Sequence, residues 1–140
     1  RAAADARQLT VRQAVTLASL IEEETARPDE APLVSAVYQN RLAIRMPLQC
    51  DPTVIYGLRR RGTYGGRLTR SDLASPTPYN TYLRGGLPPG PIANPGEKSL
   101  RAALCPGNHE YLYFVSMNTG SHHFSRTLAE HEQAVRRYQE

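Results

Sequence analysis

The chain of 140 residues lacks the features that mark several large classes of protein. It has two cysteines, Cys50 and Cys105, and no Cys-x-x-Cys pair, so at most one disulfide is possible, and we favour two free thiols. No apolar run approaches the roughly 18 to 20 residues of a membrane-spanning helix, and no signal peptide is visible. Phosphate-binding glycine loops and the Gly-x-Ser-x-Gly motif are also missing, so nothing supports nucleotide binding or α/β-hydrolase chemistry.

Residues typical of metal and nucleic-acid sites are equally sparse. His122, His123 and His131 are close in sequence, but they lack the spacing of metal ligands, and neighbouring histidines in a strand point to opposite faces. The net charge is +4, yet the only dense basic run, residues 59–61, leads into a glycine-containing segment. That composition favours a solvated loop, with an anionic polymer or a membrane surface as the alternative. We expect no metal, no cofactor and no nucleic-acid partner.

The composition that remains is that of an ordinary domain. Apolar residues make up 40% and charged residues 21% of the chain, which is long enough for one domain with its own core. We therefore expect a single domain over residues 1–140. The abrupt start at residues 1–5 suggests a cut within a longer protein.

Capping signals and hydrophobic periodicity predict mostly helices. A helix over residues 10–25 opens with a capping box of Thr10 and Gln13 and contains neither glycine nor proline. The same signals predict a second helix over residues 33–42, before Pro47, and a third from Asp51-Pro52 to Gly57, with Asp51 as N-cap. A fourth helix is predicted over residues 95–104, with Asn94 as a possible cap. The last helix should begin at a capping box of Thr127 and Glu130, and one side of it carries Leu128, His131, Val135 and Tyr138.

Strand and loop signals complete the expected architecture. Residues 111–117 and 122–125 predict two strands joined by a turn. Residues 58–96 are rich in Gly, Pro, Thr, Asn and Tyr, and a loop this long usually builds a binding surface. The predicted fold class is α+β: a mostly helical single domain with a small antiparallel β-hairpin and a long Pro/Gly/Tyr-rich cleft loop.

Glu22 is the candidate site residue in the first predicted helix. A projection at about 100° per residue places it on an apolar stripe with Val11 and Ala18, whereas Glu23 joins Ser19 on the polar face. A carboxyl group on an apolar face should have a raised pKa, which would allow it to donate a proton at neutral pH. Three consecutive glutamates at a helix end are also typical of a solvated charged face.

The loop beside this acid suggests a sugar substrate. Tyrosine offers a flat apolar face with a hydroxyl, and asparagine offers both a donor and an acceptor. Cleavage of a glycosidic bond needs an acid for the leaving oxygen and usually a second carboxylate. Asp51 is the nearest candidate, although a role as a helix cap also explains it. If Glu22 acts alone, the C6 hydroxyl of the sugar can attack C1 while Glu22 takes a proton back.

A series of motifs then resembles the endolytic murein transglycosylase family, also called MltG or YceG-like. The similarity covers roughly residues 9–135 in the right order, and the series is far more specific than any single block. The blocks are Ala18-Ser19-Leu20-Ile21-Glu22-Glu23-Glu24-Thr25, Val37-Tyr38-Gln39-Asn40-Arg41-Leu42, Leu48-Gln49-Cys50-Asp51-Pro52-Thr53-Val54-Ile55-Tyr56-Gly57, Thr77-Pro78-Tyr79-Asn80-Thr81-Tyr82, Gly86-Leu87-Pro88-Pro89-Gly90-Pro91-Ile92 and Tyr111-Leu112-Tyr113-Phe114-Val115.

The resemblance implies an activity, a site and a location. The activity is cleavage of peptidoglycan glycan strands between N-acetylmuramic acid and N-acetylglucosamine, leaving a 1,6-anhydro end without a cofactor. Glu22 matches the first glutamate of the Glu-x-Glu-Thr motif and is implied to be the general acid and base, while Glu24 is implied to have a supporting or structural role. Residues implied to line the glycan cleft are Gln49, Asp51, Tyr79, Asn80 and Tyr82.

Two departures and one missing region qualify the resemblance. Cys50 stands where the family usually has threonine, which puts a hydrogen bond from that position in doubt, and Glu132 stands where many relatives have asparagine. Relatives also carry an N-terminal membrane anchor and a LysM-like region. The resemblance therefore implies a catalytic fragment from the outer face of the bacterial cytoplasmic membrane, with cell-wall synthesis proteins as possible partners and membrane attachment only through the missing anchor.

Two rival functions stay open. One is a glycoside hydrolase that uses Glu22 with Asp51, and the mass of its product would include the water that an anhydro product lacks. The other is a non-catalytic glycan-binding module of a cell-wall synthesis complex.

Overall fold

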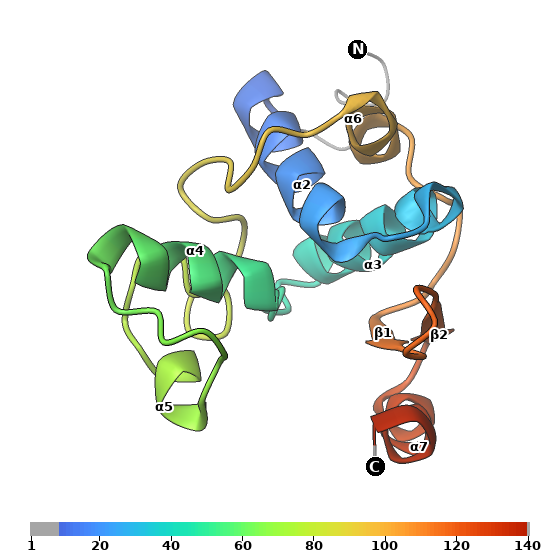
Figure 1. Cartoon of the computed structure of the whole chain (residues 1–140). Helices are drawn as coiled ribbons and strands as arrows, with labels where there is room; N and C mark the ends of the chain where they lie inside the picture. The colour runs from blue at the N-terminus through green and yellow to red at the C-terminus, as the bar shows by residue number, and fades with distance from the viewer. Residues whose placement is uncertain (1–8, 140) are drawn as a thin grey trace.

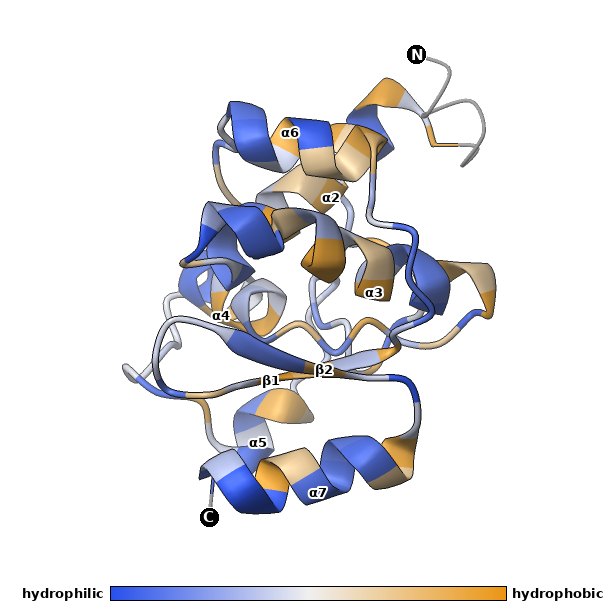
Figure 2. Ribbon diagram, turned by 90° about the vertical axis from the view of Figure 1, so that its right-hand side faces the viewer, coloured by the Kyte–Doolittle hydropathy of each residue, from blue (hydrophilic) through white to orange (hydrophobic). Residues whose placement is uncertain are grey.

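A computed structural model describes residues 9–139, and three helices form its upper layer (Figure 1). These helices are α2 (Val11–Glu24), α3 (Ala31–Ala43) and α6 (Glu97–Leu104), with a 3₁₀ turn, η1 (Pro28–Glu30), between α2 and α3. Figure 2 shows α6, α2 and α3 stacked above the β-hairpin, with α7 below it. Residues 1–8, where the sequence predicts a cut, lie outside the described part.

Helix α2 begins as predicted, but its buried face differs from the predicted stripe. Thr10 and Gln13 form both hydrogen bonds of the capping box, at 2.9 and 3.0 Å. Val11 is 66% exposed, however, whereas Thr16 and Ser19 are buried. These two hydroxyls can be buried because they donate to helix carbonyl groups, at 2.8 and 2.6 Å. The predicted stripe is therefore confirmed at Ala18, which is fully buried, and wrong at Val11 and Glu22, which are exposed.

The core lies where the three helices meet. Its side chains are fully or almost fully buried, and each buried leucine, isoleucine or valine contributes roughly 1.5 to 3 kcal/mol by leaving water. The largest are Tyr38, Leu17, Leu20, Ile21, Leu48 and Val34.

Helix α4 (Asp51–Arg61) extends from this layer, and the short α5 (Arg70–Leu73) packs on it. Asp51 is the first residue of α4 and Cys50 is the N-cap, so Asp51 is not the predicted cap. The helix passes through Gly57 and ends four residues later, because Gly62 adopts the left-handed conformation (φ 73°) that terminates helices. Gly57 serves packing instead: a Cβ atom there would lie 2.5 Å from Oγ1 of Thr77.

The chain ends in the predicted β-hairpin and final helix. Strands β1 (Tyr113–Ser116) and β2 (His122–Ser125) are antiparallel, with Phe114 opposite Phe124. The Phe114 ring meets Tyr38 of α3 edge-on at 5.8 Å, while Tyr113 stacks at 4.9 Å on His131 of α7 (Leu128–Gln139). The hairpin is therefore held between α3 and α7.

Most expected elements are confirmed, with a few corrections. The α+β class and the small hairpin are confirmed, and both cysteines are free. The capping box of Thr127 and Glu130 forms. Gly96, not Asn94, is the N-cap of α6, and Leu128 is 52% exposed instead of facing inward. Within residues 9–139, no helix is long and apolar enough to cross a membrane.

Candidate functional site

A cleft of about 420 Å³ lies at the C-terminal end of α2. Figure 1 shows the start of α4 and the β-hairpin on either side of that helix end. Residues from all three elements line the cleft, together with residues of α7 and the connecting loops. The polar lining includes Glu24, Gln49, Asp51, Tyr82, His122 and His131.

Glu24 is a carboxyl group of the cleft that retains its proton more readily than an ordinary glutamate. Burial, followed by the negative charges of Asp51 and Glu23, raises its pKa to about 7. It sits on the last turn of α2, where the helix dipole also disfavours a negative charge. At neutral pH a substantial fraction of Glu24 therefore carries a proton that it can donate.

Asp51 lies in the same cleft and is held by Tyr82. The Tyr82 hydroxyl donates a hydrogen bond of 2.5 Å to Oδ1 of Asp51. Burial and this carboxylate raise the pKa of Tyr82, so its hydroxyl remains a donor across the physiological range. The cleft thus combines a carboxyl group of raised pKa on α2 with an aspartate held by Tyr82 at the start of α4.

Glu22 has a different environment from the one that the sequence predicts. Its side chain is exposed, and its Oε1 accepts hydrogen bonds from the Gly96 backbone N–H at 3.0 Å and from the Ser99 hydroxyl at 2.9 Å. These bonds lower the pKa of Glu22. The predicted rise was wrong because Glu22 caps the start of α6. The catalytic assignment of Glu22 stays a prediction, but the raised pKa on which it was based is not found.

Gln49 presents its side chain to the cleft from a backbone conformation that is rare for non-glycine residues. Its φ angle is 51°, in the left-handed region, and the residue is exposed. The Gln49 N–H donates to the carbonyl of Thr81 at 3.3 Å, which ties this bend to the loop that carries Tyr82. Strain of this kind clusters at functional sites.

Asn80 and Tyr79 support the loop and do not line the cleft. The amide of Asn80 is fully buried and donates to the carbonyls of Leu73 and Ser75, at 2.9 and 2.8 Å, while its oxygen accepts from the Tyr82 N–H at 2.9 Å. Asn80 therefore shapes the turn that places Tyr82. The Tyr79 ring packs on Tyr56 at 4.8 Å.

Arg41 and His122 are among the cleft residues that were missed as site candidates from the sequence. Arg41 donates to the carbonyls of Leu112, Pro47 and Leu48 at 2.7 to 3.1 Å, joining α3 to the hairpin and to the segment before α4. His122 lines the cleft from β2, whereas His123 faces α7, where its ring lies 5.9 Å from Tyr138. Strand alternation does predict opposite faces for these histidines, but not which of them meets the cleft.

The described part of the chain has no arrangement of side chains that supports a metal site. Across residues 9–139, no group of three or more His, Cys, Asp and Glu side chains is placed to hold a metal ion. Glu24 and Asp51 are the two acidic residues among the cleft lining, and the histidines of the lining come from different elements.

Comparison with known proteins gives consistent matches. The sequence model of the YceG-like family matches residues 1–137. An endolytic murein transglycosylase of Bacillus subtilis (strain 168) is 44% identical over 131 residues, which are 94% of this chain and 36% of that relative. An endolytic murein transglycosylase of Streptococcus pneumoniae serotype 2 (strain D39) is 31% identical over 135 residues, covering 92% of this chain and 24% of that relative.

A solved structure has the same fold. The crystal structure of a YceG-like protein from Listeria monocytogenes superimposes with a TM-score of 0.85 at 41% sequence identity, over 96% of this chain and 43% of that chain. The chain spans about a third or less of the length of the curated relatives that it matches.

Proposed function

Because the chain belongs to the YceG-like family, we propose that it is the catalytic part of an endolytic lytic transglycosylase acting on peptidoglycan. The reaction proposed is cleavage of the β-1,4 bond between N-acetylmuramic acid and N-acetylglucosamine within a glycan strand, with a 1,6-anhydro end as product. The names of the two curated relatives support the general activity.

The observation that carries the chemical proposal is that Glu24 and Asp51 line the same cleft, where burial and the charge of Asp51 raise the pKa of Glu24 to about 7. A group of this kind is costly for stability, since the folded chain must hold a carboxyl group among like charges. A role in catalysis, in which this proton is transferred, explains such an arrangement. We therefore assign the general acid to Glu24, in preference to Glu22, which caps α6 and does not line the cleft.

The reaction follows from the two carboxyl groups of the cleft. Glu24 gives its proton to the glycosidic oxygen, and the bond from that oxygen to C1 of the muramic acid breaks. The carboxylate of Asp51, fixed by Tyr82, stabilises the positive charge that develops at C1. The C6 hydroxyl of the same sugar then forms a bond to C1, and its proton passes to Glu24, which returns to its starting state.

A two-carboxylate glycoside hydrolase is the rival that the geometry also favours. Glu24 and Asp51 line the same cleft and the negative charge of Asp51 acts on Glu24, as expected for an acid paired with a base or nucleophile. In that case water replaces the C6 hydroxyl. The product would then be heavier by one water molecule than the anhydro product.

Location and partners extend the same proposal. A protein that cleaves peptidoglycan would work outside the cytoplasmic membrane, attached through an anchor in a longer chain. Cell-wall synthesis proteins are its proposed partners. A non-catalytic glycan-binding module remains the alternative from another class.

The decisive experiment digests purified glycan strands with the chain and determines product masses. Internal cleavage to fragments with anhydro ends is the expected result. Products carrying the extra water would replace the transglycosylase with a hydrolase. Binding of the glycan strands without any cleavage would favour the non-catalytic glycan-binding module.

A further inference from the structure

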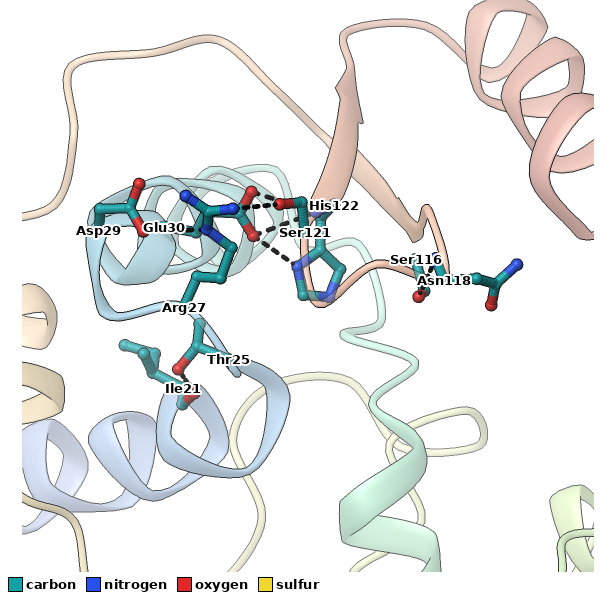
Figure 3. Close-up of polar contacts among 9 residues, drawn as sticks. All are labelled: Ile21, Thr25, Arg27, Asp29, Glu30, Ser116, Asn118, Ser121 and His122. Atoms are coloured by element: carbon teal, nitrogen blue, oxygen red, sulfur yellow. Dashed lines mark hydrogen bonds and ion pairs between the residues drawn. The ribbon is translucent and has the colours of Figure 1, made fainter.

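Glu30 and His122 form a buried pair beside the cleft, although 92 positions separate them in the sequence (Figure 3). Their side chains are only 12% and 10% exposed. Both oxygens of Glu30 lie 3.1 Å from the backbone N–H of His122, and Oε1 also lies 2.9 Å from Nδ1 of the imidazole. One carboxylate therefore holds both the start of β2 and the ring that it carries.

This contact determines which ring nitrogen carries the proton. A carboxylate can only accept, so Nδ1 must be the donor. In the neutral ring Nε2 is then an acceptor with a free lone pair. Nε2 has no hydrogen-bond partner among residues 9–139, and His122 itself lines the cleft.

Packing keeps the ring in this orientation. The Phe114 ring meets His122 edge-on at 5.1 Å, and Phe124 lies 6.0 Å away. The preceding residue is anchored as well, because Arg27 donates to the Ser121 hydroxyl at 3.2 Å (Figure 3). The imidazole is therefore fixed by a charged partner on one side and by aromatic rings on others.

A structural role alone does not require an imidazole at this position. The two backbone contacts to Glu30 already join η1 to β2, and the contacts with the two phenylalanines need only a flat or apolar side chain. An imidazole adds a neutral acceptor to a cleft whose acidic groups are Glu24 and Asp51. Hydroxyl and acetamido N–H groups of a sugar are donors that such an acceptor can bind.

We propose that His122 contacts the bound glycan, with Nε2 accepting a hydrogen bond from a hydroxyl or acetamido N–H, and that Glu30 is a positioning residue that sets its tautomer and orientation. This inference rests on the proposed glycan substrate. It assigns the hairpin side of the cleft a direct part in substrate recognition, opposite the carboxyl groups at α2 and α4.

The tautomer is tested by ¹⁵N NMR of the histidine side chains in the full 140-residue chain. We expect the neutral ring of His122 in the free chain to carry its proton on Nδ1. Purified glycan strands, added to the Glu24→Gln variant to prevent turnover, should shift the Nε2 resonance of His122. The resonances of His123, on the opposite face of β2, serve as the internal control and should not move.

Variants separate positioning from folding. His122→Ala should lower kcat/KM on glycan strands by about tenfold, mainly through KM, because one hydrogen bond to the substrate is lost. Glu30→Ala should give a similar loss and a mixture of tautomers, whereas Glu30→Gln, whose amide oxygen can still accept from Nδ1, should restore most of the activity. His123→Ala is the matched control and should leave kcat/KM unchanged.

Three outcomes would overturn this inference: a proton on Nε2 in the free chain, an Nε2 resonance that does not respond while other cleft resonances shift, or unchanged kcat/KM in His122→Ala. Failure of the proposed function is distinct. If the wild-type chain binds strands and shifts Nε2 but cleaves nothing, the catalytic proposal falls and the His122 contact stands. If no cleft resonance responds to strands, both fall.

Discussion

Glu24 and Asp51 face one cleft from different helices, and the charge of Asp51 helps to hold the pKa of Glu24 near 7. Each carboxyl group has its own support: Glu24 is partly buried at the end of α2, and Asp51 accepts a hydrogen bond from Tyr82. The raised pKa lets Glu24 hold a proton at neutral pH in part of the molecules, and such a proton is available for acid catalysis of bond cleavage.

Replacing each glutamate of the α2 triplet in turn should separate their roles. Glu24→Gln should lower kcat on glycan strands by roughly 10²- to 10⁴-fold, because the proton donor is lost. Glu22→Gln should stay within a few fold of the wild type, since the amide oxygen can still accept at α6. Product formation is followed by chromatography of the digested strands. Loss of activity in Glu22→Gln with Glu24→Gln active would return the assignment to Glu22.

The pH dependence of turnover should show the ionisation of Glu24. Its protonated form is the active acid, so kcat should fall as the pH rises through about 7. Asp51→Asn removes the nearby negative charge and should move the pKa of Glu24 down towards 4.5, its ordinary value. Carboxyl ¹³C NMR titration of both chains gives the pKa directly. An unchanged pKa in Asp51→Asn would show that the two groups do not interact.

Because of Glu24, the free energy of unfolding should also fall as the pH rises. Its pKa is higher in the folded chain than the ordinary 4.5, so the folded state binds the proton more tightly between about pH 4.5 and 7. This stabilisation is fully present below about pH 4.5 and is lost as the pH rises through about 7. Its upper limit is about 3 kcal/mol. Glu24→Gln should therefore be more stable than the wild type at pH 8. Urea unfolding of both chains at pH 5 and 8 measures the difference.

Glu22 should contribute to the stability of the folded chain, because it accepts hydrogen bonds at the start of α6. Glu22→Ala removes the acceptor for Gly96 and Ser99 at the start of α6 and should lower the free energy of unfolding by about 1 kcal/mol. The lowered pKa of Glu22 means that this stabilisation is present above its ordinary pKa and is lost as the pH falls below it. Ser99→Ala removes one of the two bonds and should cost less. Thermal unfolding at pH 7 and pH 3 tests both.

Cys50 offers a stabilising change. It is the N-cap of α4 with an extended backbone (φ −97°, ψ 109°), but its thiol makes no capping bond. Cys50→Ser would place a hydroxyl near the Thr53 N–H, which already donates to the Cys50 carbonyl at 3.1 Å, so the hydroxyl would share that donor and should stabilise the chain by less than about 1 kcal/mol. Cys105→Ser, at an exposed position outside the helices, is the control and should have little effect on Tm.

Much of the fold follows from local sequence signals. The capping boxes at Thr10 and Thr127, the prolines that end or begin helices, and the alternation in the hairpin depend only on residues a few positions apart, so they can be read without a structure. The predicted end of α4 at Gly57 failed because a distant residue, Thr77, requires a glycine inside that helix.

The roles within the site could not be read in the same way. The sequence indicates a helix that ends in acids, a loop rich in tyrosine and asparagine, and an ordered motif series, and these together indicate a glycan-cleaving enzyme family. Which acid holds a proton depends on groups far away in the chain: Gly96 and Ser99 lower the pKa of Glu22, while burial and Asp51 raise that of Glu24. Burial, hydrogen bonds and neighbouring charges set a pKa, and only the tertiary structure brings them together.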